Sequence, residues 1–129
     1  MSHTRLTPHP SISQAIEALR SSKPEVAETL CSDHLNLHPE SVEHLRLLGH
    51  ALMQQRRFDE AETQLKIAIG LAPEFAPLAE DLGSALAQQR KFEEAIPIFE
   101  QAVRQDPGLA NAHKKLGQEI GRASCRERV

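Results

Sequence analysis

Apolar residues in the middle of the chain follow two helical periods separated by a short polar turn. The first stripe has leucines at i, i+3 and i+7, and the second has Ala, Leu and Ala at i, i+4 and i+7. The residues of the two stripes are Leu45, Leu48, Leu52, Ala61, Leu65 and Ala68. Because each spacing places its residues on one face of an α-helix, we predict two amphipathic helices. They are joined by "QQRRF", and the second ends at Pro73, which lacks a backbone N–H.

The same arrangement returns 34 residues later. When residues 42–75 are aligned on residues 76–109 without gaps, 12 of the 34 positions are identical, against roughly two or three expected by chance. A glycine inside a helix costs about 1 kcal/mol relative to alanine, so its return at one position indicates a close helix contact. We expect Gly49 and Gly83 to face Ala61 and Ala95 of the helices that follow them.

These repeats resemble the tetratricopeptide repeat. "LRLLGHAL" with "AETQLKIAIGLAP", and "AEDLGSAL" with "AIPIFEQAVRQDP", are similar to the family pattern W-x2-L-G-x2-Y, A-x3-F and P. Leu45 and Ala79 stand in place of the Trp, and Leu52 and Leu86 in place of the Tyr. The resemblance implies an all-α fold, a tandem helix-turn-helix solenoid (superhelix) of about three and a half repeats.

The predicted domain organisation has three parts. They are a flexible N-terminal arm over residues 1–10, a repeat array over 11–118 and a non-native, disordered tail over 119–129. Within the array we place repeats at about 11–40, 41–74 and 75–108, with a partial repeat over 109–118.

Two places depart from a regular repeat. In the first repeat we expect the register to slip by one residue at a shorter turn, so that Ile12, Ala15, Ile16 and Leu19 form the inward stripe and Ser11 and Gln14 form a capping box. In the last repeat Pro97 stands inside a predicted helix. We expect a slight bend or a late helix start there.

The closing residues, "EIGRASCRERV", have no apolar period. One choice of codons for residues 119–129 reproduces, after its first base, a widely used short-read sequencing adapter, and the tail is identified by that resemblance. The alternative is a native basic tail. Our hypothesis is that native sequence ends near residue 118, inside a fourth repeat, and that the chain is a truncated fragment.

Charge and composition narrow the classes of function. The formal net charge is −3 with acids and bases interleaved, so no single-signed patch favours nucleic acid or an anionic membrane. The sequence has no apolar run typical of a signal peptide or a membrane span, and we predict a cytoplasmic protein. It also lacks a phosphate loop, a nucleophile elbow and a catalytic constellation. We therefore expect no enzymatic activity and no cofactor in this fragment.

One group of side chains has metal-ligand character. "CSDHLNLH" places Cys31, His34 and His38 at i, i+3 and i+7 of one helix face, a set that zinc accepts. Cys31 and His34 also match the inward positions Leu65 and Ala68. We favour packing against the preceding helix over a metal site.

In the family it resembles, the first helices of the repeats line a concave groove that binds peptides or partner helices. The resemblance therefore implies a protein-protein interaction module, a scaffold or adaptor, whose partner is a protein, a peptide or another domain of the full-length chain. The groove residues would be Ser13, Glu17, Arg20, Glu43, Arg46, His50, Met53, Glu80, Ser84, Ala87, Lys114 and Gln118.

The resemblance also bears on the type of ligand. Chaperone-binding members of the family hold a C-terminal carboxylate with Lys and Asn. That clamp is absent at the corresponding positions, which are Ser13, Glu17, His50, Pro77 and Asp81. The carboxylates of Glu17, Glu80 and Asp81 would repel such a peptide end.

A second resemblance supports an alternative function. "APEFAPLAEDLG" and "LANAHKKLGQ" are similar to repeats that precede a sulfotransferase domain in bacterial proteins. The alternative is therefore the non-catalytic N-terminal arm of a larger enzyme.

Overall fold

The computed structural model describes residues 10–109, 114–118 and 120–121. The helices are α1 (Pro10–Arg20), α2 (Pro24–Leu37), α3 (Val42–Gln54), α4 (Phe58–Leu71), α5 (Ala76–Gln88) and α6 (Phe92–Gln105). Residues 114–118 are also helical, and no residue in the described ranges lies in a strand. The all-α prediction is confirmed.

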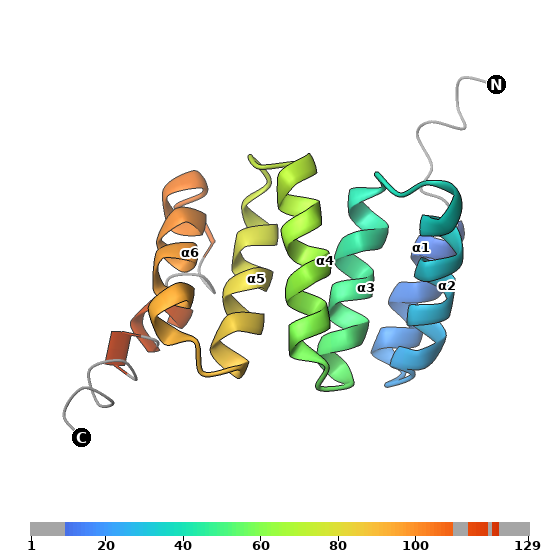
Figure 1. The fold of residues 1–129 in the computed structure, drawn as a ribbon, viewed down its shortest axis with the longest axis horizontal. Coiled ribbons are helices and arrows are strands. Elements are labelled where there is room, and N and C mark those ends of the chain that lie inside the picture. The colour runs from blue at the N-terminus through green and yellow to red at the C-terminus, as the bar shows by residue number, and fades with distance from the viewer. Residues whose placement is uncertain (1–9, 110–113, 119, 122–129) are drawn as a thin grey trace.

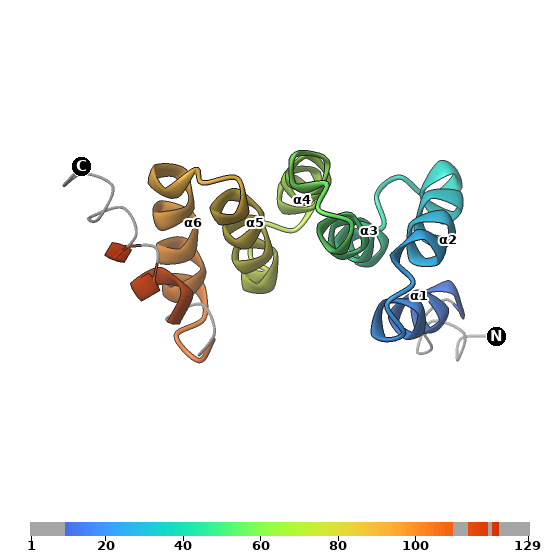
Figure 2. The same ribbon diagram turned by 90° about the horizontal axis from the view of Figure 1, so that it is seen from below.

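The helices form an open row in chain order (Figure 1). Each helix packs against the next one, and α3 also contacts the other first helices, α1 and α5. Seen from below, α1, α3 and α5 line the hollow, lower side of a curved array, and α2 and α4 stand behind them (Figure 2). This is the helix-turn-helix solenoid that the sequence predicts.

The turn inside each helix pair is built in the same way three times. Ser22, Arg56 and Arg90 have positive φ angles of 58°, 61° and 63°. The next residue donates its backbone N–H to a carbonyl five residues earlier, as in Arg57 N to Leu52 O at 2.9 Å. These bonds and the left-handed residue form a Schellman motif, which satisfies carbonyls at the end of the first helix.

These turns show that the first repeat keeps the 34-residue register. Ser22 precedes Arg56 by 34 residues, and Arg56 precedes Arg90 by 34, so the predicted one-residue slip is wrong. The buried residues of α1 are Ser11, Ala15 and Ala18. They occupy the positions of Leu45, Gly49 and Leu52, so small side chains keep the inward stripe in register although their low hydrophobicity hides it in the sequence.

The capping-box prediction required Ser11 to cap α1, and this prediction is wrong. The helix begins at Pro10, and Ser11 Oγ lies 2.7 Å from Nε2 of the buried His44 on α3. A second hydroxyl, Ser41 Oγ, lies 2.7 Å from Nδ1 of the same ring. Both ring nitrogens of His44 therefore have hydrogen-bond partners, as a buried imidazole requires.

The repeated glycines lie at close helix contacts, but their partners are one turn further along than predicted. A Cβ on Gly49 would stand 3.1 Å from the side chain of Leu65, and one on Gly83 would stand 2.6 Å from the ring of Phe99. The glycines therefore make room for a large side chain of the second helix, and the atoms nearest to them belong to Leu65 and Phe99, one turn beyond Ala61 and Ala95.

Pro97 lies inside α6, which begins at Phe92 as the other second helices begin at Pro24 and Phe58. Of the two alternatives, the late start is therefore wrong, and the slight bend stays a prediction. Pro97 cannot donate an N–H within the helix, while Ala95, Phe99 and Ala102 of the same helix remain buried.

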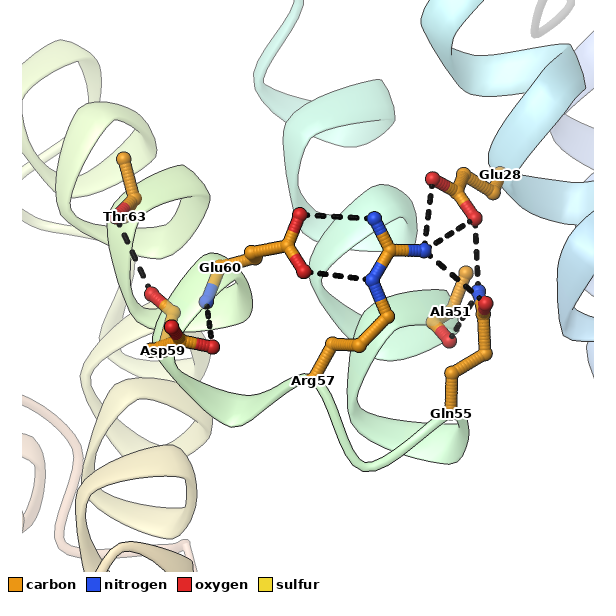
Figure 3. A network of polar contacts seen from close by, with 7 residues as sticks. All are labelled: Glu28, Ala51, Gln55, Arg57, Asp59, Glu60 and Thr63. Carbon is orange, nitrogen blue, oxygen red and sulfur yellow. Dashed lines mark hydrogen bonds and ion pairs between the residues drawn. The ribbon is translucent and has the colours of Figure 1, made fainter.

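Polar side chains at the turns join neighbouring repeats on the other side of the array. Arg57 Nη1 donates to Glu28 Oε1 of α2 at 2.9 Å, and Gln55 Nε2 donates to the same oxygen at 2.9 Å (Figure 3). Arg57 also pairs with Glu60 at 2.6 Å. The arginine of one repeat thus links the second helix of the preceding repeat to its own second helix.

The next repeat has the equivalent clamp around Glu62. Gln89 Nε2 and Lys91 Nζ donate to Glu62 Oε1 at 2.8 and 3.2 Å, and Lys66 Nζ lies 2.6 Å from Oε2. Burial alone would raise the pKa of Glu62, but the hydrogen bonds from Lys66, Gln89 and Lys91 outweigh it and lower the pKa to about 2. The folded state therefore holds Glu62 as a carboxylate.

Gly83→Ala should destabilise the fold by about 1–2 kcal/mol, because overpacking against Phe99 exceeds the gain in helix propensity. Gly70→Ala is the matched control: it lies in α4 with nothing within 4 Å of the added Cβ, so it should stabilise by about 0.5–1 kcal/mol. Urea denaturation measures both. Equal effects of the two substitutions would contradict the close contact at Gly83.

Glu62 should make the stability depend on acidic pH. Its folded pKa lies below its ordinary value near 4.5, so its contribution is complete above about pH 4.5 and is lost as the pH falls toward 2. Glu62→Gln should therefore cost on the order of 2 kcal/mol at pH 6 and much less at pH 2. Glu100→Gln, on the exposed face of α6, is the control and should cost little at either pH. A cost of Glu62→Gln that does not change with pH would refute this role.

Candidate functional site: a groove between the first helices

Two pockets lie between α1 and α3 on the hollow side of the array. We call one the Phe75 pocket; it has a volume of about 450 Å³ and is lined by Ile12, Val42, Glu43, Arg46, Leu47, Ala72 and Phe75. The other, the Met53 pocket, also has a volume of about 450 Å³ and is lined by Ile16, Leu19, Arg20, His50, Met53 and Gln54. Both have one wall from α1 and one from α3, so they follow each other along a single groove.

The helical register explains why both walls are apolar near α1. Ile12, Ile16 and Leu19 are spaced i, i+4 and i+7 and form one stripe. The inward positions of α1 are filled by other residues, so this stripe turns toward the groove. Ile16 remains 36% exposed and Phe75 remains 46% exposed, which leaves hydrophobic surface available for a partner.

The wall that α3 forms also carries polar side chains, Arg46 and His50, which Asp81 of α5 holds in place. Asp81 Oδ2 accepts hydrogen bonds from Arg46 Nε at 2.6 Å and from His50 Nε2 at 2.9 Å. The guanidinium of Arg46 also lies over the Phe75 ring, with its central carbon 5.6 Å from the ring centroid, within the range of a cation-π contact. Asp81 therefore holds two predicted groove residues in place.

The charges around Asp81 keep it ionised. Burial would raise the pKa of this carboxyl group, but the hydrogen bond and charge of His50, together with the charge and hydrogen bond of Arg46, lower it below its usual range. Asp81 and Arg46 thus neutralise one another. The repulsion expected from Asp81 is accordingly weakened.

The predicted groove residues fall into groups. Those that line the two pockets are Arg20, Glu43, Arg46, His50 and Met53. Ser13 and Glu17 line neither pocket, because they were assigned with the slipped register. Lys115 Nζ donates to Ser84 Oγ at 2.8 Å and to Glu80 Oε1 at 3.4 Å. Ala87 is buried, and Lys114 and Gln118 are exposed. Whether any of these residues contacts a ligand stays a prediction.

The sequence reasoning missed the apolar part of the groove, Ile12, Ile16, Leu19 and Phe75. A usable signal was present: subtracting 34 from Arg46, His50 and Met53 gives Ile12, Ile16 and Leu19. The assumed slip concealed it.

The three residues weighed as metal ligands are placed by packing against different neighbours. Cys31 is fully buried in the core cluster with Ala15 and Ala18 of α1, as predicted for an inward position. Burial raises the pKa of its thiol to about 11. His34 packs toward the following helix instead of the preceding one, with its ring stacked on His44 at a centroid distance of 3.6 Å. His38 lies 4.8 Å from His34 between ring centroids.

The family model of the tetratricopeptide repeat matches residues 12–74 and 46–110. The chain belongs to the tetratricopeptide repeat (TPR) family. No curated protein matches it. The helix pairs and the groove described above are thus those of a TPR array, an architecture that presents an extended concave surface.

The TPR chain has the fold of solved TPR domains. It is similar to the first TPR domain of human RPAP3, with a TM-score of 0.88 and 17% identity, covering 92% of this chain and 93% of that one. It is similar to the second TPR domain of human RPAP3 in complex with an HSP70 peptide, with a TM-score of 0.80 and 19% identity, covering 85% and 92%.

A larger protein shows higher sequence identity. A mutant O-GlcNAc transferase of Thermobaculum terrenum is 29% identical with a TM-score of 0.81, and the match covers 85% of this chain but 21% of the transferase. The TPR chain therefore spans about a fifth of that protein.

Two sequence predictions concern the two ends of the chain. The arm residues 1–9 and the tail residues 119 and 122–129 lie outside the described residues; Pro10, assigned to the arm, is the first residue of α1. The identity of the tail stays a prediction. Among the described helices, none has the length and apolar character to cross a membrane.

The register of α1 can be tested in solution. Ala18→Gln should destabilise by about 1–3 kcal/mol, because it forces a larger polar side chain into the core. Ile16→Gln should cost less than about 1 kcal/mol, because Ile16 faces the open groove. Guanidinium denaturation ranks the two variants. The slipped register predicts the opposite order, with Ile16 buried and Ala18 facing outward.

Proposed function

We propose that the TPR chain is a protein-protein interaction module that binds a peptide or a partner segment in the groove between α1 and α3. The observation that carries the proposal is the pair of apolar pockets, which expose Ile16 and Phe75 on the hollow side of the array. Hydrophobic side chains that line a concave surface typically mark a binding groove.

The polar side chains of α3 also suit this role, because their positions are fixed. Arg46 and His50 are held by Asp81, so a ligand does not have to order them, and binding loses less conformational entropy. A TPR domain with the same fold was solved in complex with an HSP70 peptide, which supports a peptide as the type of ligand. The partner in this case is a protein, a peptide or another domain of the same full-length chain.

The test is a random peptide library displayed on phage and selected against the purified chain. Selected peptides should bind the chain and lose at least about tenfold in affinity with Ile16→Asp, because a charge replaces an apolar contact surface. Ile67→Asp is the matched control, since Ile67 is 46% exposed on α4, behind the groove. Circular dichroism confirms that both variants fold. Peptides that depend on Ile67 and ignore Ile16 would place the binding site on the other face.

The second candidate function is the non-catalytic arm of a larger enzyme. It is favoured by the match to a region of an O-GlcNAc transferase chain and by the sequence resemblance to repeats that precede sulfotransferase domains. The two candidates differ in what the gene encodes downstream. A long catalytic domain after residue 118 supports the enzyme arm, and one or two further helices followed by a stop codon support the free-standing adaptor.

A further inference from the structure

We propose that the groove selects an extended segment with apolar side chains at positions i and i+3, a cationic residue beside one of them and an anionic residue beside the other. This inference rests on the proposed function, because it specifies the chemistry of the ligand for the same groove. Three observations carry it: the spacing of the two pockets, the polar side chains that α3 contributes to both of them, and the charges at their rims that take part in no ion pair among the described residues.

The spacing of the pockets sets the spacing of the anchors. Ile12 and Leu19 are seven residues apart on α1 and line different pockets, as do Arg46 and Met53 on α3. At a rise of 1.5 Å per residue, the two pockets are about 10 Å apart along the helices. A polyproline II segment rises about 3.1 Å per residue with three residues per turn, so its side chains i and i+3 point the same way about 9 Å apart.

The polar side chains of α3 that line the two pockets, Arg46 and His50, favour an extended segment over a helix. An amphipathic helix that reaches both pockets with residues i and i+7 also presents apolar residues at i+3 and i+4. Those residues would meet Arg46 and His50, whose side chains are fixed by Asp81. An extended segment instead brings peptide N–H and C=O groups to these polar side chains, where they can form hydrogen bonds.

The rims of the two pockets carry opposite charges. In the Phe75 pocket Asp81 neutralises Arg46, so Glu43 supplies the net charge. In the Met53 pocket the charge is that of Arg20. Across the described part of the chain, neither Glu43 nor Arg20 takes part in an ion pair. Complementary groups on the ligand are a cation near Glu43 and an anion near Arg20.

The experiment uses labelled synthetic peptides and fluorescence polarisation with the full 129-residue chain. The probe is GKLPALEG, in which two leucines are spaced i and i+3, lysine and glutamate flank them, and proline favours the extended conformation. Its control GKSPASEG replaces both leucines. The probe should bind at least about tenfold more tightly than this control, because each leucine buries apolar surface in a pocket.

Charge variants test the rims without assuming which way the peptide runs. The wild-type chain should prefer GKLPALEG over GKLPALKG and GELPALEG by about two- to fivefold, the effect of one exposed ion pair. Arg20→Glu should shift the preference to GKLPALKG, and Glu43→Arg should shift it to GELPALEG. These shifts should weaken at high salt. An unchanged order of preference in both variants overturns the assignment of charges.

The outcomes separate this inference from the proposed function. Suppose that library peptides bind the wild-type chain and lose binding with Ile16→Asp, whereas GKLPALEG does not bind up to about 1 mM. This result overturns the extended two-anchor ligand and leaves groove binding intact. A selected helical peptide that has anchors at i and i+7 and depends on Ile16 also overturns the extended ligand and leaves groove binding intact. Library peptides that ignore Ile16→Asp contradict the proposed function itself.

Discussion

The contact between the two helices of each pair is the constraint on which the array depends. One position of the first helix must be small so that a larger side chain of the second helix can reach it. Gly83 admits Phe99, and Gly49 admits Leu65. In the first pair Ala15 and Cys31 occupy the corresponding positions, 34 residues before Gly49 and Leu65, and share one core cluster. The added methyl of Ala15 is thus matched by a smaller partner, which gives Cys31 a packing role.

This constraint fixes the rotation of α1 and thereby creates the groove. With Ala15 buried in the core, the stripe of Ile12, Ile16 and Leu19 lies toward the pockets that α1 forms with α3, and only Leu19 of the three also packs against the core cluster. Hydrophobicity alone would favour burial of that stripe, since its side chains are larger and more apolar than those of Ser11, Ala15 and Ala18. The glycine-position contact and the left-handed residue Ser22 override this preference. Part of this apolar surface, at Ile16, therefore stays exposed.

The same competition explains which parts of the structure could be predicted from the sequence. Helices α3 to α6 follow from leucine and alanine periods that agree with the 34-residue repeat, so period and register point to one answer. In α1 the two signals disagree. The prediction used the hydrophobic period, but the 34-residue spacing gives the correct register. The error moved the predicted groove from Ile12 and Ile16 to Ser13 and Glu17. The predicted positions on α3, such as Glu43, Arg46 and His50, do line the pockets, because the register of that helix was correct.

Contacts made by side chains far apart in the sequence were the least predictable. The bond of Arg46 to Asp81 joins residues 35 apart, and the stacking of His34 on His44 turns a predicted inward residue toward the next repeat. Each depends on how two helices are placed, which a period along one helix does not encode. A 34-residue comparison of polar positions would have revealed the clamps, since Glu28, Gln55 and Arg57 recur as Glu62, Gln89 and Lys91.

The clamps also show how the repeats differ. Ile96 stands 34 residues after Glu62, so the position of α6 that corresponds to Glu28 and Glu62 has no carboxylate. The described helix over residues 114–118 is instead held by α5: Lys115 bonds Glu80 and Ser84, and Leu116 packs against the core. Asp81, next to Glu80, bonds Arg46 and His50 of α3. Polar side chains on one short stretch of α5 therefore hold the first helices of the repeats on both sides of it.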